Sequence, residues 1–170
     1  MGEDDYRILP FEDAAGVSER DVVDLWLAET ELDEAVATER VREIAFVALD
    51  GGGALVGVST TYISHDRRLR TEIWHMRAFV AALHRESDIA TRLVRATRQH
   101  LETRWVAGDD LRAPGILMEV ENPILKQFAN QAVWVRPETP EGQWMFIGEN
   151  ARGDHLRVYW FPGARAPLPS

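Results

Sequence analysis

The segment TEIWHMRAFVAALHRESDIATRLVRATRQHLE, residues 71–102, changes its hydrophobic pattern half-way along. Residues 74–83 are mostly apolar with few breakers, which predicts a central β-strand. After the polar residues 84–87, apolar side chains recur at helical spacing from Asp88, and Ser87 or Asp88 can cap the helix that this spacing predicts. A strand that enters a helix through a tight turn directs several backbone N–H groups at one point. We therefore expect the turn to favour an anion, most often a phosphate.

The rest of the chain predicts further strands and helices on both sides of this segment. The predicted strands are residues 6–11, a hairpin of 45–49 and 54–63, residues 115–120, and a closing hairpin of 144–147 and 155–161. The predicted helices are a short one that ends near Glu29, a second at about 33–42, and a third at 123–132, which Asn122 can cap. Residues 64–70 are predicted to form an exposed polar turn.

Length and composition limit the classes of protein to which the chain can belong. At 170 residues we expect one domain, residues 1–162, followed by a proline-rich tail at 163–170. The lack of cysteine excludes disulfides, thiolate metal sites and a cysteine nucleophile, and no histidine or carboxylate spacing indicates a metal site. The net charge of −9 argues against nucleic acid as a partner. Because no apolar run approaches the length of a membrane span, we expect no membrane partner and a cytoplasmic location.

The turn at residues 85–90 resembles the cofactor-binding turn of the GNAT acyltransferase superfamily. In that family the turn reads Gln or Arg, two residues, Gly, one residue, then Gly or Ala, and it cradles the pyrophosphate of acetyl-CoA. Arg85 and Ala90 match this pattern, whereas Asp88 replaces the first glycine and brings a carboxylate that repels a diphosphate. The order of the predicted elements is also similar to that of the family. The chain thus resembles a divergent GNAT member, which implies an α/β (α+β) fold with a mixed, mostly antiparallel sheet of about six to seven strands and about four helices.

The resemblance implies that acetyl-CoA, or another acyl-CoA, is the co-substrate. The backbone N–H groups of the turn would bind the diphosphate, with help from Arg85 and Arg92, and the pantetheine arm would run along residues 79–83 as an added strand. In the family an asparagine often lies near the cofactor at the end of the next strand, and Asn122 resembles it, although capping of its own helix explains Asn122 equally well. The expected cofactor-binding residues are Val80, Ala82, Leu83, Arg85, Glu86, Ser87, Asp88, Ile89, Ala90, Arg92 and Asn122.

The resemblance implies transfer of an acyl group directly to a small-molecule or peptide amine. Glu72 and His75 are candidate general bases on the central strand, with Glu119 as a third, and His75 has the best-matched ordinary pKa. Where the family often has a proton-donating tyrosine, this chain has Phe128, so we expect Tyr159 to take that role.

Each of these side chains also has a simpler interpretation as a surface or packing residue. Together, Asp88 and Phe128 favour an alternative in which the protein has lost transfer and serves as a binding or regulatory module. Both a monomer and a homodimer are compatible with the sequence.

Overall fold

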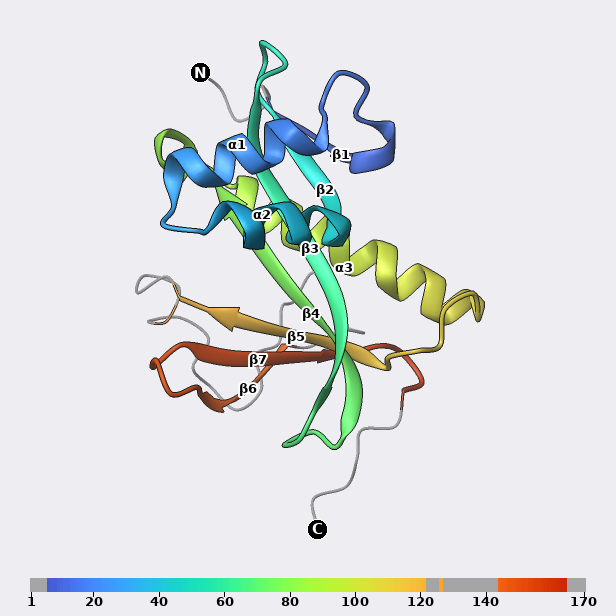
Figure 1. The fold of residues 1–170 in the computed structure, drawn as a ribbon. Helices are drawn as coiled ribbons and strands as arrows, with labels where there is room; N and C mark the ends of the chain where they lie inside the picture. The colour runs from blue at the N-terminus through green and yellow to red at the C-terminus, as the bar shows by residue number, and fades with distance from the viewer. Residues whose placement is uncertain (1–5, 122–125, 127–143, 165–170) are drawn as a thin grey trace. The chain divides into compact units, whose positions relative to one another are not determined.

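The computed structural model describes residues 6–121, Lys126 and residues 144–164. Its contacts divide the chain into two compact units, residues 1–61 with 77–99 and residues 62–76 with 100–170, and the prediction of a single domain stays a prediction. The strands are β1 (Arg7–Pro10), β2 (Ile44–Leu49), β3 (Leu55–Asp66), β4 (Thr71–Val80), β5 (Gly115–Val120), β6 (Trp144–Glu149) and β7 (His155–Trp160) (Figure 1). The helices are α1 (Glu19–Glu29), α2 (Glu34–Arg40) and α3 (Ile89–Ala107), with short 3-10 turns at Phe11–Asp13, Val41–Glu43 and Ala82–His84.

The strands form a seven-stranded sheet in the order β1-β2-β3-β4-β5-β7-β6. The β4–β5 pair is parallel, whereas the pairs β1–β2, β2–β3, β5–β7 and β6–β7 are antiparallel. The predicted fold class, a mixed and mostly antiparallel sheet flanked by helices, is confirmed. The described residues contain three α-helices, and the additional helix predicted at residues 123–132 lies outside them except for Lys126.

In the first unit, β2 has a buried cluster on each of its two faces. Val47 and Leu49 belong to a cluster that includes Trp26 of α1, and Phe46 and Ala48 belong to another that includes Leu93 of α3. Successive side chains of a strand point to opposite faces, so this alternation lets one strand contribute to the packing of both helices. The beginning of α3 is thereby fixed against the sheet by buried apolar residues.

In the second unit, β5 lies between β4 and β7 and pairs with both. It pairs in parallel with β4 from Trp74↔Ile116 to Met76↔Met118 and in antiparallel with all six residues of β7. Ile73, Leu117, Leu156 and Val158 form the buried cluster of this unit. A Cβ at Gly115 would overlap the carbonyl oxygen of Tyr159, so the close approach of β5 and β7 requires glycine there.

Several predicted boundaries were wrong. The polar turn predicted from Ser64 begins later, because residues 64–66 continue β3. The central strand begins earlier than predicted, since residues 71–73 already belong to β4. The central strand ends at Val80 rather than at Leu83, since a 3-10 turn follows. The predicted helix at 33–42 ends at Arg40 and continues as a 3-10 turn. By contrast, the strand at 115–120 is confirmed residue for residue.

Candidate functional site

The turn between β4 and α3 lies within the first unit, and part of its backbone has no hydrogen-bond partner among the described residues. The N–H of His84 donates to Ala81 O at 2.9 Å, and that of Ser87 donates to His84 O at 3.1 Å. The N–H of Ile89 faces Ser87 Oγ at 3.4 Å. By contrast, no described residue accepts from the N–H groups of Glu86, Asp88 or Ala90.

These three N–H groups precede or open a helix of 19 residues. The positive end of the helix dipole lies at this point, so the turn has both the donors and the field that stabilise an anion.

Both arginines that were expected to bind a phosphate donate hydrogen bonds to backbone carbonyl oxygens of the protein. Arg85 Nε donates to Val80 O at 3.1 Å, and Arg92 Nη2 donates to Tyr6 O at 2.8 Å. Arg92 Nη1 also lies 3.8 Å from Asp88 Oδ1, an ion pair between residues four positions apart at the start of α3. Asp88 therefore has a cationic neighbour, which partly offsets the repulsion between its carboxylate and an incoming anion.

Two residues far away in sequence support this turn, and the sequence interpretation missed both. The Tyr6 hydroxyl is 3.0 Å from His84 Nδ1, with the two rings in an edge-to-face arrangement. Glu29, the last residue of α1, accepts from the N–H of Ala82 at 3.0 Å. These contacts join positions 78 and 53 residues apart, so no local pattern indicates them.

The two candidate bases on β4, Glu72 and His75, lie in the second unit and have different partners. His75 Nε2 is 2.8 Å from Ser64 Oγ, and the Tyr62 ring stacks on the imidazole at a centroid distance of 4.7 Å and an angle of 11°. Glu72 Oε1 is 3.2 Å from His65 Nδ1, with both side chains more than half exposed. Positions three apart on a strand point to opposite faces, so Glu72 and His75 cannot act on the same side of the sheet.

The remaining candidate residues of the second unit are held in polar contacts. Tyr159 is 2% exposed, and its hydroxyl donates a hydrogen bond to the Glu102 carboxylate of α3. Glu119 forms an ion pair with Arg152 at 2.9 Å. Asn122 and Phe128 lie outside the described residues. The structure thus brings Tyr159 together with a carboxylate that the sequence interpretation did not consider.

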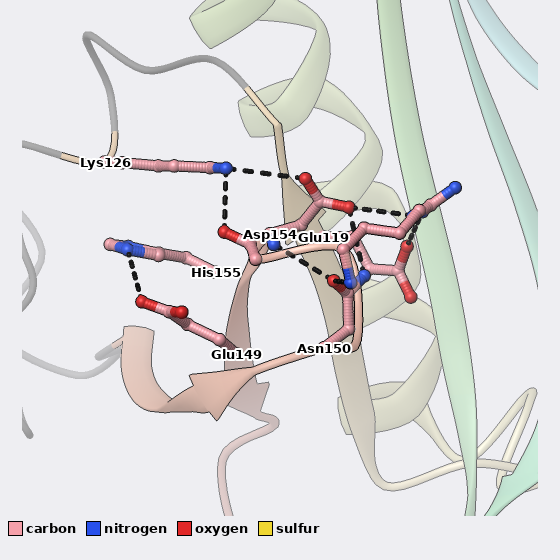
Figure 2. Close-up of polar contacts among 8 residues, drawn as sticks. Glu119, Lys126, Glu149, Asn150, Asp154 and His155 are labelled. Carbon is pink, nitrogen blue, oxygen red and sulfur yellow. Dashed lines mark hydrogen bonds and ion pairs between the residues drawn. The ribbon is translucent and has the colours of Figure 1, made fainter.

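The turn between β6 and β7 contains a polar network that was not predicted (Figure 2). Asp154, which is 7% exposed, accepts from Asn150 Nδ2 at 3.0 Å and from Arg152 Nε at 3.1 Å, and Lys126 Nζ lies 3.4 Å from it. The hydrogen bond from Asn150 is the largest single cause that holds the pKa of Asp154 below its ordinary value, and Lys126 and Arg152 lower it further. His155 Nε2 lies 3.5 Å from Glu149 Oε1 beside this network. These contacts close the hairpin, and the lowered pKa favours the ionised form of the Asp154 carboxylate at their centre.

The described residues contain no group of three or more side chains suited to hold a metal ion. Among the same residues, no helix is both long and apolar enough to cross a bilayer.

Comparison with known proteins identifies the fold. No family model matches the chain, and no curated protein matches it in sequence. Solved structures do match: a GNAT-family acetyltransferase from Staphylococcus aureus MU50 is 12% identical over 92% of this chain and 98% of its own, with a TM-score of 0.52. The chain has the GNAT fold.

Toxins share this fold with the chain. A structure described as a bacterial toxin is 11% identical over 92% of this chain and 89% of its own, with a TM-score of 0.55. A mutant of the toxin AtaT, bound to the C-terminus of the antitoxin AtaR and to acetyl-CoA, is 17% identical over 91% of this chain and 92% of its own, with a TM-score of 0.50. At these identities the similarity establishes the GNAT fold alone, so the activity must be argued from the residues of this chain.

Proposed function

We propose that the protein is an acyl-CoA-dependent N-acyltransferase that moves an acetyl group from acetyl-CoA directly to the amine of a small molecule or peptide in the cytoplasm. The observation that supports this proposal most strongly is the turn after β4, where the N–H groups of Glu86, Asp88 and Ala90 have no acceptor among the described residues. A diphosphate supplies oxygens for such N–H groups. In this proposal Ser87, Ile89 and Arg92 shape the turn, and Val80, Ala82 and Leu83 meet the pantetheine arm.

The acceptor amine must lose a proton before it can attack the thioester. An amine with an ordinary pKa of about 10.4 is mostly charged at pH 7, and the deficit is roughly 4–5 kcal/mol. In our proposal His75 accepts this proton, since imidazole titrates near neutral pH and its ring is held by Ser64 and Tyr62. The amine nitrogen bonds to the acyl carbon, and the CoA thiolate departs. Tyr159 remains the proposed proton donor to that thiolate, for which it would have to release Glu102.

The alternative function, a GNAT-fold module that binds but does not transfer, is favoured by the carboxylate of Asp88. At a side-chain exposure of 47%, this group lies in solvent at the start of α3, where an anion would bind. Binding of acetyl-CoA without turnover of any amine would support this alternative.

Thermal unfolding with and without acetyl-CoA tests the proposal first. At about 100 times its dissociation constant, a ligand specific for the native state adds roughly 2.7 kcal/mol to the free energy of unfolding and raises the melting temperature. Release of free CoA thiol in the presence of a panel of amines then tests transfer. No thermal shift at millimolar acetyl-CoA would refute the proposal, whereas a shift without thiol release would select the binding module.

A further inference from the structure

Immediately after β4, two backbone groups point away from the neighbouring strand β3. The N–H of Ala81 donates to Val56 O of β3 at 2.9 Å, and Ala81 is extended, with φ −55° and ψ 144°. Along an extended chain, the C=O of the preceding residue and the N–H of the following residue point to the side opposite to that N–H. The C=O of Val80 and the N–H of Ala82 therefore face the same side of the chain, away from β3. A parallel strand would pair there through a single residue, using one donor and one acceptor.

Two side chains occupy these two groups. Glu29 Oε2 accepts from the N–H of Ala82 at 3.0 Å, and Arg85 Nε donates to Val80 O at 3.1 Å. The two side chains also approach each other, with Arg85 Nη2 at 3.9 Å from Glu29 Oε2. Together they offer one acceptor and one donor on the same side, which is what one residue of an added strand offers through its C=O and its N–H.

We propose that Glu29 and Arg85 substitute for the N–H and C=O groups of a bound ligand in the ligand-free protein, and that Glu29 thereby controls affinity for acyl-CoA. This inference rests on the proposed function, because the groups in question are the N–H of one amide and the C=O of the next amide in the pantetheine arm. To pair with Val80 and Ala82, the arm must first displace the Glu29 carboxylate. The displaced carboxylate is on the surface, with its side chain already 25% exposed, so it returns to water. Affinity is reduced by about the strength of the charged hydrogen bond that is broken, roughly tenfold.

The test compares Glu29→Ala with Glu31→Ala by calorimetric titration. Glu31 is exposed and lies two residues away in the following loop, so Glu31→Ala removes the same charge without changing a contact of the turn. The ligands are acetyl-CoA and 3′-phosphoadenosine 5′-diphosphate, which carries the diphosphate but has no pantetheine amides. We expect Glu29→Ala to bind acetyl-CoA about tenfold more tightly than Glu31→Ala does, and the two variants to bind the nucleotide equally.

A second readout follows the Ala82 amide by hydrogen exchange. This amide should exchange slowly in the wild type, fast in Glu29→Ala, and slowly again when acetyl-CoA is added to that variant. Glu29→Ala should also lower the melting temperature of the ligand-free protein, so stability and affinity change in opposite directions. If Glu29 merely caps the 3-10 turn, its replacement would lower both the melting temperature and the affinity for acetyl-CoA.

The outcomes separate this inference from the proposed function. If the wild type binds acetyl-CoA and Glu29→Ala binds it equally or more weakly, or if Ala82 stays fast-exchanging in the complex, then Glu29 is only a cap and the proposed function stands. If no variant binds acetyl-CoA or the nucleotide at millimolar concentration, the proposed function is wrong and this inference is wrong with it.

Discussion

Replacing Asp88 by asparagine should strengthen cofactor binding while it weakens the fold. The carboxylate lies at the start of α3 and is about half exposed, 3.8 Å from Arg92 Nη1. A diphosphate with two negative charges about 5 Å away would be repelled by roughly 1.7 kcal/mol at the dielectric constant of water, and by about 1 kcal/mol after screening by salt. Removing the charge should therefore tighten acetyl-CoA binding about fivefold. The same carboxylate stabilises the helix N-terminus, so the ligand-free variant should lose about 0.3–1 kcal/mol of stability.

The assay combines calorimetric titration of acetyl-CoA with urea unfolding of the ligand-free variants. Glu39→Gln, which removes one exposed charge from α2, serves as the control for net charge. Asp88→Gly should bind at least as tightly as Asp88→Asn, because it also frees the backbone at the position where the family has glycine. Unchanged or weaker binding by Asp88→Asn, or equal tightening by the Glu39 control, would show that the diphosphate does not bind at this turn.

Two further predictions concern the second unit. His75→Gln should lower kcat about a hundredfold or more and leave the dissociation constant of acetyl-CoA unchanged, whereas Glu72→Gln, on the opposite face, should have little effect; the reverse pattern in steady-state kinetics would assign the base to Glu72. Asp110→Asn should lower the free energy of unfolding by about 1–2 kcal/mol, because hydrogen bonds from Arg112 hold the pKa of the buried Asp110 at about 2, below its ordinary 3.8. This contribution is fully present above pH 3.8 and is lost as the pH falls toward 2, so unfolding curves of the wild type and the variant should converge over that range. Curves that stay equally far apart down to pH 2 would contradict the assignment.

Local patterns were enough to predict the elements whose residues specify them directly. Ser18 and Asp21 form reciprocal hydrogen bonds at the start of α1, and a serine three residues before an acidic residue is typical of such a cap. Asp50 closes the hairpin turn by accepting from the N–H groups of Gly52 and Ala54. Such contacts join residues two to four apart, so the spacing of residue types in the sequence contains them.

Contacts between distant residues account for what the sequence could not predict. Ser64 belongs to β3 and its hydroxyl contacts His75 of β4, although residue type alone predicted a polar turn from Ser64 onward. The partners of the turn are Tyr6, which precedes β1, and Glu29, the last residue of α1, and both adjoin the turn only after folding. The sequence predicted a turn between β4 and α3 where the structure has one, but it could not show that side chains from elsewhere in the protein contact that turn. Anion binding at the turn stays a prediction.

The most direct test of the central claim is an amide NMR titration of the wild-type protein with CoA. Our account predicts that the largest shifts occur at the N–H groups of Glu86, Asp88 and Ala90, and that they saturate together with the binding isotherm. If these three resonances do not move at saturating CoA, or if the shifts lie in another part of the chain, the turn after β4 does not hold the diphosphate and the account is contradicted.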